Sequence, residues 1–173
     1  VICWQRKNGR RRSIETHRQG DCSNIRMEKS VSVVIPTYNR KEILKKTLLS
    51  FVDQTFKDFE VIVADDGSTD GTEEMIKTSN FPYSIKHFWQ KNSGRSAARN
   101  LGIQNSEGKI ILFIDDHIIA DRKLIEEHVK FHKMYCNNKI KVIRGRVEFY
   151  DSLEKVPKST NYIPLDQIKH SLN

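Results

Sequence analysis

The triplet Asp115-Asp116-His117 follows directly after the apolar run Ile110 to Ile114. Carboxylate oxygens with an imidazole nitrogen suit Mn²⁺ or a similar divalent cation that is held jointly with phosphate oxygens. Solvated residues at the end of a strand are the alternative interpretation of this triplet. The metal interpretation gains weight because two other apolar runs also end in polar residues.

One of these is the segment Asp65 to Gly71 (DDGSTDG), which follows a second apolar run. Glycine tolerates positive φ, and Asp or Ser side chains accept hydrogen bonds from free amides at a helix start, so turn chemistry explains part of the segment. The adjacent carboxylates Asp65 and Asp66 cost energy after a buried strand unless a polar or cationic group uses them. The other run ends in Pro36 to Arg40 (PTYNR).

Short apolar runs alternate with longer segments of helical period, which predicts an α/β fold with a buried parallel sheet. The expected strands are Val31 to Ile35, Phe59 to Ala64, Ser84 to Trp89, Ile110 to Ile114 and Lys139 to Phe149, the last broken near Gly145. The expected helices cover about residues 43–52 and 121–135, and two further helical segments follow Asp70, through Met75 and Ile76, and Ser93, through Ala97, Ala98 and Gly102. Ligands of such folds bind beyond the carboxyl ends of the strands, which is where the polar segments would lie.

Several side chains carry expectations about local structure. Asp70 is expected to cap its helix, and the small residues Ala98 and Gly102 would let their helix approach the sheet closely. Trp89 is expected to pack in the core rather than to stack on a ligand. His128 and His132 are spaced for a shared metal, but ordinary helix residues explain them better.

Residues 1–26 hold seven Arg or Lys against Glu15 and Asp21, so they supply most of the formal net charge of +8. They show neither strand nor helix period, and we expect a disordered basic tail that is not part of the fold, with Met27 as the natural start. No nucleic-acid partner is expected. The alternative, a nucleic-acid-binding arm, would show as salt-sensitive binding lost on deleting residues 1–26.

The rest of the 173-residue chain, with its 37% hydrophobic content, suits one domain over residues 27–150 and an irregular segment over 151–173. Cys3, Cys22 and Cys136 form no disulfide framework or CxxC site, which favours a reducing, cytoplasmic setting. The sequence contains no run of about 18 apolar residues, so no transmembrane segment is expected in it.

Four segments together resemble glycosyltransferase family 2, whose members have the GT-A fold. They are VSVVIPTYN from Val31, QTF at Gln54 with FEVIVADDGSTDGT from Phe59, NSGRSAARNLGI from Asn92, and ILFIDDHII from Ile111. Their order and spacing carry the resemblance across nearly all of residues 31–149. It implies a three-layer α/β/α sandwich with a mainly parallel sheet, truncated at its C-terminal side.

The resemblance also implies a nucleotide site. The residues to which it gives a role are Pro36, Thr37 and Tyr38 in the nucleoside pocket, Asp66 as acceptor of a hydrogen bond from the base, commonly uracil, Arg95 near the phosphates, and Asp115 and Asp116. Arg99 is expected to support the loop that opens its helix. The family's Asp-x-Asp reads here as Asp115-x-His117, which implies Mn²⁺ or Mg²⁺ on those two residues. In another register Asp115 and Asp116 form the working pair and His117 flanks it.

The implied activity is transfer of a sugar from a nucleotide-diphosphate donor, a UDP-sugar, to a carbohydrate or lipid-linked acceptor with inversion. The resemblance implies a role in cell-surface polysaccharide or glycoconjugate synthesis, and with the cytoplasmic setting above we expect the protein at the inner face of the membrane. No residue fits the catalytic base, which is expected beyond Asn173, because Asp151, Glu154 and Asp166 match no motif. The alternative is a catalytically incomplete module that only binds sugar nucleotides.

Overall fold

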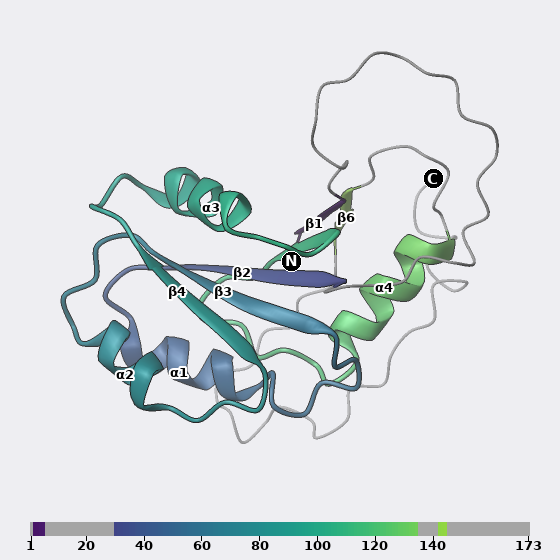
Figure 1. The fold of residues 1–173 in the computed structure, drawn as a ribbon, viewed down its shortest axis with the longest axis horizontal. Coiled ribbons are helices and arrows are strands. Elements are labelled where there is room, and N and C mark those ends of the chain that lie inside the picture. The colour runs from purple at the N-terminus through teal and green to yellow at the C-terminus, as the bar shows by residue number, and fades with distance from the viewer. Residues whose placement is uncertain (1, 6–29, 135–141, 145–173) are drawn as a thin grey trace, which may run out of the picture.

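A computed structural model describes residues 2–5, 30–134 and 142–144 of the chain. Its elements are β1 (Ile2–Gln5), β2 (Val31–Thr37), α1 (Lys41–Leu49), β3 (Phe59–Asp65), α2 (Thr72–Thr78), β4 (Ser84–Trp89), α3 (Arg95–Gln104), β5 (Ile110–Phe113), α4 (Leu124–Met134) and β6 (Val142–Arg144) (Figure 1). The strands expected within residues 31–114 and all four helices are confirmed, with ends that differ by a few residues. Of the strand expected over residues 139–149, the described part is β6.

The strands form one sheet in the order β4-β3-β2-β5-β1-β6. The pairs β3–β4, β2–β3 and β2–β5 are parallel, whereas β1 runs antiparallel to both of its neighbours. The chain crosses from each parallel strand to the next through a helix, as such connections require. The carboxyl ends of β2, β3, β4 and β5 therefore meet at one edge of the sheet.

The strand β1 corrects the expectation for the start of the chain. Residues 1–26 were expected to lie outside the fold, but Ile2–Gln5 pairs with β5 along its whole length, from Ile2 opposite Phe113 to Gln5 opposite Ile110. An unpaired edge of β5 would leave its backbone N–H and C=O groups without partners, and a short apolar strand supplies them. Residues 6–29 lie outside the described residues.

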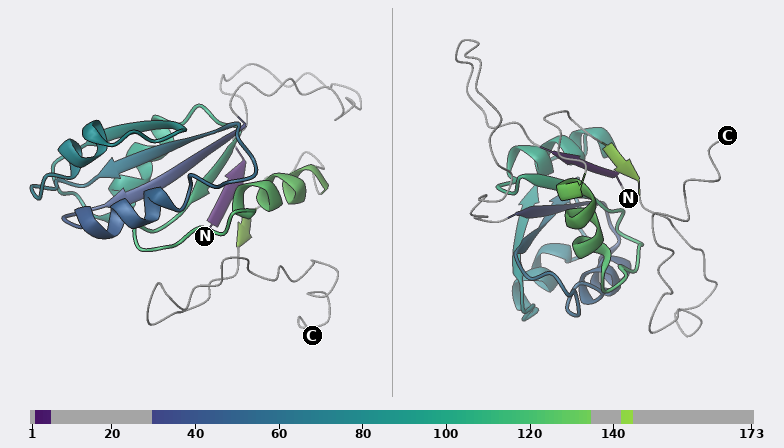
Figure 2. Two further views of the ribbon diagram at one scale, coloured as in Figure 1. Left: turned by 90° about the horizontal axis from the view of Figure 1, so that it is seen from below. Right: turned by 90° about the vertical axis from the view of Figure 1, so that its right-hand side faces the viewer.

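Helices cover both faces of the sheet, α3 on one side and α1 and α2 on the other (Figures 1 and 2). Side chains of β2 alternate between these layers, as the strand period requires. Val33 and Ile35 pack in the larger core with residues of α1, α2 and α4, while Val34 packs in the smaller core, beside Ile103 of α3. The three-layer α/β/α architecture is thereby confirmed.

Close approach of α3 to the sheet is also confirmed. A Cβ atom added at Gly102 would clash with Cγ1 of Val34, and Ala98 on the same helix is buried. The small side chains leave room for the helix to lie directly on β2 and β3. Through this contact the start of α3 is fixed at the carboxyl edge of the sheet.

Two local expectations were wrong. Trp89 ends the edge strand β4 with 56% of its surface exposed, because its neighbour Phe88 takes the position that faces the smaller core. Helix α2 is capped by Gly71 in a left-handed conformation (φ 83°), one residue later than expected. Asp70 still helps the helix to start, since its Oδ1 accepts bonds from the amide and the hydroxyl of Thr72.

Helix α4 carries His128 and His132, each 5% exposed, so both are core residues rather than the ordinary helix residues that the sequence suggested. Burial lowers the pKa of His128 to about 4, and the charge of the nearby His132 contributes to the shift. No helix among the described residues has the length and apolar character needed to cross a bilayer.

Candidate functional site

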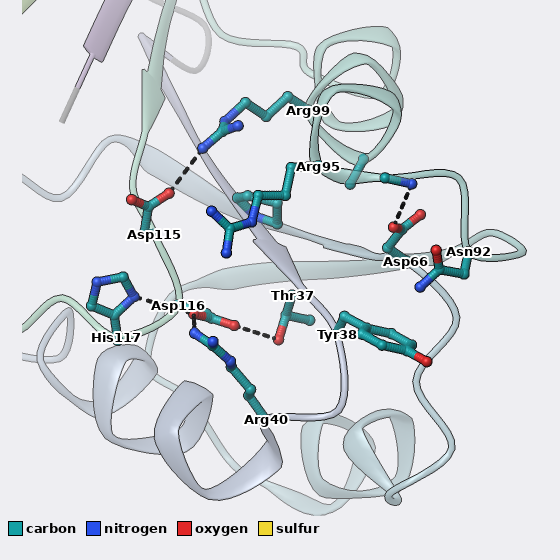
Figure 3. Close-up of a pocket in the computed structure, with 13 residues that line it drawn as sticks. Thr37, Tyr38, Arg40, Asp66, Asn92, Arg95, Arg99, Asp115, Asp116 and His117 are labelled. Carbon is teal, nitrogen blue, oxygen red and sulfur yellow. Dashed lines mark hydrogen bonds and ion pairs between the residues drawn. The ribbon is translucent and has the colours of Figure 1, made fainter.

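A cavity of about 270 Å³ opens at the carboxyl ends of β2, β3 and β5, beside the start of α3 (Figure 3). Every residue for which the sequence predicted a nucleotide or metal contact lines it. These are Pro36, Thr37, Tyr38, Asp66, Arg95, Asp115, Asp116 and His117. The lining also contains Arg40, Asn92, Gly94, Ala98 and Arg99. We call this cavity the donor cleft.

The side chain of Asp66 anchors the loop between β4 and α3, which forms one wall of the cleft. Its Oδ1 accepts hydrogen bonds from Gln90 Nε2 (2.6 Å) and the Ser93 amide (2.9 Å), and its Oδ2 accepts one from the Gly94 amide (2.8 Å). Although burial acts to raise the pKa of this carboxyl, these donors hold the pKa below its usual value. Asp66 is therefore a carboxylate that shapes the loop leading into α3.

The neighbouring Asp65 points elsewhere and is buried in the protein. It accepts a hydrogen bond from the Ser68 amide and forms an ion pair of 3.0 Å with His87 of β4. Burial opposes the ionised form, but these partners lower the pKa of Asp65 overall. The two adjacent carboxylates thus both have partners within the chain, and neither needs a ligand to offset its charge.

The loops after β2 and β3 are joined by reciprocal hydrogen bonds. The Asn39 amide donates to Ser68 Oγ (2.9 Å), and the Thr69 amide donates to Asn39 Oδ1 (2.8 Å). Asn39 adopts a left-handed φ of 50°, which Asn tolerates better than most residues do. These bonds set Tyr38 at the cleft, where 48% of its surface is exposed.

Asp116 connects the loop after β5 to β2 and α1. Its side chain is 8% exposed and contacts Thr37 Oγ1 (3.1 Å), Arg40 Nη1 (3.2 Å) and His117 Nδ1 (3.4 Å). Its backbone carbonyl accepts a further bond from Thr47 Oγ1 (2.7 Å). A carboxylate with so many partners serves as a support of the loop.

Asp115 and His117 differ from Asp116 in both exposure and direction. The side chain of Asp115 is 53% exposed and that of His117 is 55% exposed, and both lie at the same side of the cleft (Figure 3). The described residues give the Asp115 carboxylate one partner, Arg99 Nη2, at 3.0 Å. Of the two registers open from the sequence, this arrangement favours Asp115 with His117 as the accessible pair.

The accessible side chains of the cleft suit a divalent cation whose remaining ligands are oxygen atoms of phosphate or water. A carboxylate and an imidazole are accessible, and His117 Nδ1 lies next to Asp116, as metal-binding histidines commonly lie next to a carboxylate. Within the described part of the chain no three His, Cys, Asp or Glu residues gather as a complete metal site. Any metal held here would need phosphate or water oxygens as further ligands.

Sequence reasoning did not assign Arg40 to the cleft, and it gave Arg99 to the loop that opens α3. The structure places both guanidinium groups in the cleft, where each pairs with an aspartate. A signal for Arg99 was available, because it follows Arg95 by one helical turn and so lies on the same face of the helix. No sequence pattern pointed to Arg40 in the same way, because the direction of its side chain depends on the contact with the buried carboxylate of Asp116.

Comparisons with known proteins agree with this geometry. The model of the family "Glycosyl transferase family 2" matches residues 32–164. An uncharacterized glycosyltransferase of Rickettsia conorii is 43% identical over 101 residues, which make up 58% of this chain and 17% of that protein. The chain thus spans about a sixth of the length of that relative.

Solved structures with the same fold include TarS of S. aureus, residues 1–349, determined with UDP and with UDP-GlcNAc. The UDP complex has 29% identity and a TM-score of 0.58, covering 62% of this chain and 33% of that chain. The mannosyltransferase PcManGT of Pyrobaculum calidifontis, determined with GDP-Man and Mn²⁺, has 24% identity and a TM-score of 0.56, covering 59% and 32%. At that identity the second likeness shows the fold alone. With the family match over most of its length, this chain belongs to glycosyltransferase family 2 and has the GT-A fold.

Proposed function

We propose that this chain forms the donor site of a glycosyltransferase, which binds a nucleoside diphosphate sugar together with a divalent cation. One observation carries the proposal: all residues expected from the sequence to contact the donor line a single cleft. They come from strand ends, loops and a helix start that are far apart in the sequence and meet only at the carboxyl edge of the sheet. This is the edge at which open α/β sheets bind their ligands.

For the base we propose uracil. Each carboxylate oxygen has two lone pairs, and of the four on Asp66 three accept bonds from Gln90, Ser93 and Gly94. One lone pair of Oδ2 is left for an N–H donor such as uracil N3. The UDP and UDP-GlcNAc complexes of TarS, at 29% identity, support the same choice.

For the cation we propose Mn²⁺ or Mg²⁺ on Asp115 and His117. Such a cation neutralises the charge that develops on the nucleotide as the sugar leaves. Arg95 lines the cleft and has no ion pair among the described residues, so its guanidinium is available to the diphosphate. Asp116 and Arg40 hold the loop that presents Asp115 and His117.

The full proposed reaction is transfer of the sugar to a carbohydrate or lipid-linked acceptor with inversion, in polysaccharide or glycoconjugate synthesis at the inner face of the membrane. The cleft carboxylates are engaged by hydrogen bonds and ion pairs with the chain itself. We therefore propose that the base for the acceptor comes from outside the described residues. Donor binding without transfer by this chain is consistent with that arrangement.

A thermal-shift panel of UDP, GDP and their sugars, with and without Mn²⁺, tests the donor site. A ligand at about 100 times its dissociation constant stabilises the folded protein by roughly 2.7 kcal/mol, which raises the melting temperature measurably. UDP and UDP-sugars should raise it more with Mn²⁺ than without, and Asp115→Asn should remove the effect of Mn²⁺. The exposed Asp53→Asn is the matched control and should respond as the wild type does. Unchanged melting temperatures with every nucleotide would refute the proposal.

A further inference from the structure

The charges that line the donor cleft cancel. Its carboxylates are those of Asp66, Asp115 and Asp116, and its guanidinium groups are those of Arg40, Arg95 and Arg99. With three groups of each sign, the lining has no formal excess of negative charge. A divalent cation on its own therefore meets little electrostatic attraction in the cleft.

The most accessible carboxylate of the cleft is that of Asp115, and its partner is the long, flexible side chain of an arginine. Asp66 and Asp116 are buried and bonded to their surroundings, whereas Asp115 is 53% exposed and pairs with Arg99 at 3.0 Å. The Arg99 side chain is itself 37% exposed, and ion pairs at this exposure are weak and readily exchanged. A cation approaching Asp115 has to compete with this guanidinium group.

Helix α3 presents two guanidinium groups to the cleft, one turn apart. Arg95 stands at its first position and has no ion pair among the described residues, and Arg99 reaches across to Asp115 (Figure 3). A diphosphate offers more negative charge than a carboxylate and matches the planar donor fork of Arg. Its arrival gives Arg99 a stronger partner than Asp115.

We propose that Arg99 couples the binding of nucleotide and metal in the donor cleft, a step that rests on the proposed function. In the free protein the Arg99 guanidinium forms an ion pair with Asp115. When the nucleotide binds, Arg99 turns to the diphosphate, and the Asp115 carboxylate becomes available to the cation. The two ligands then assist one another. By linkage, UDP must raise the affinity for Mn²⁺ by the same factor by which Mn²⁺ raises the affinity for UDP.

The test measures Mn²⁺ binding to the whole chain by the EPR signal of free Mn²⁺, with and without UDP. For Arg99→Met we expect the affinity for Mn²⁺ alone to rise by about two- to fivefold, the range typical of an exposed ion pair. The factor by which UDP strengthens Mn²⁺ binding should fall accordingly. Arg99→Lys keeps the charge without the planar fork and should give intermediate values.

Arg95→Met is the matched control, because it removes one guanidinium group from the same helix and leaves the ion pair intact. It should weaken UDP binding by a similar factor with and without Mn²⁺, and the coupling factor should stay at the wild-type value. If Arg99→Met leaves both the affinity for Mn²⁺ alone and the coupling factor unchanged, the inference is wrong while donor binding still stands. If the wild type binds no UDP under either condition, the proposed function itself fails.

Discussion

The hydroxyl of Thr47 on α1 donates a hydrogen bond of 2.7 Å to the backbone carbonyl of Asp116, in the loop after β5. Both partners are buried, and the bond joins the helix below the sheet to the loop that presents Asp115 and His117. The position of the loop that carries Asp115 to His117 therefore depends on Thr47, which does not line the cleft.

Thr47→Val should lower the free energy of unfolding by about 1–3 kcal/mol, because it leaves a buried carbonyl without its donor. It should also weaken Mn²⁺-dependent UDP binding through displacement of the loop. Thr78→Val on α2 is the control, since the Thr78 hydroxyl bonds a carbonyl of its own helix at an exposed position. Urea unfolding and calorimetric titration measure the two effects. Equal losses in both variants would contradict this role of Thr47.

Asp66→Asn should disturb the wall of the cleft. The amide group of Asn has one acceptor oxygen in place of two, so it cannot accept from Gln90, Ser93 and the Gly94 amide as the carboxylate does. We expect a loss of about 1–3 kcal/mol in stability and at least about tenfold weaker UDP binding. Calorimetric titration checks the affinity. Wild-type affinity in this variant would remove Asp66 from the account.

Gly102→Ala should destabilise the fold although alanine favours helices. The added methyl group would overlap Val34, and overpacking of this kind costs about 1–3 kcal/mol. Asn100→Ala, at an exposed position of the same helix, should leave stability unchanged or slightly raised. A double-mutant cycle with Val34→Ala should show that removal of the γ carbons recovers part of the loss. Strict additivity in that cycle would speak against the contact.

Stability should fall as the pH falls from about 6.5 to about 4. His128 has an ordinary pKa of 6.5 when unfolded and a pKa of about 4 in the fold, because burial and then His132 oppose its charge. In that window the unfolded chain takes up a proton that the folded protein refuses, so protonation favours unfolding. The full loss is roughly 3 kcal/mol and is reached below the folded pKa.

His128→Leu should flatten this dependence, because leucine binds no proton and Nδ1 of His128 has no hydrogen bond to lose. Val129→Ala is the control, since a cavity beside His128 should lower stability by a similar amount at every pH. Urea unfolding at pH 4.5, 5.5, 6.5 and 7.5 gives the curves. A slope in the His128→Leu variant as steep as that of the wild type would show that another group is responsible.

The sequence predicted the bounds of the parallel strands closely, and the clearest signal came from strands buried on both faces, which appear as apolar runs such as Ile110 to Ile114. It also predicted which residues meet in the cleft, since parallel strands bring their carboxyl ends to one edge. The strand Ile2–Gln5 was missed for the opposite reason. Its partner lies more than 100 residues away, and four residues are too short for a local pattern to show.

The roles of the cleft residues were harder to predict than their places. Adjacent Asp65 and Asp66 suggested that some polar or cationic group uses them, and the structure supplies such groups from the chain itself, His87 for one and the Gly94 amide for the other. Likewise, Asp116 turns inward while Asp115 stays exposed, and no spacing rule distinguishes them. Such choices depend on contacts between elements distant in sequence.

A crystal structure of the chain with UDP and Mn²⁺, with the metal located by its anomalous scattering, tests the donor site most directly. The account predicts a Mn²⁺ peak between Asp115, His117 and the diphosphate, with the base near Asp66. It also predicts Arg99 turned from Asp115 toward the phosphates. Nucleotide bound outside the cleft, or a metal whose ligands include neither Asp115 nor His117, would contradict the account.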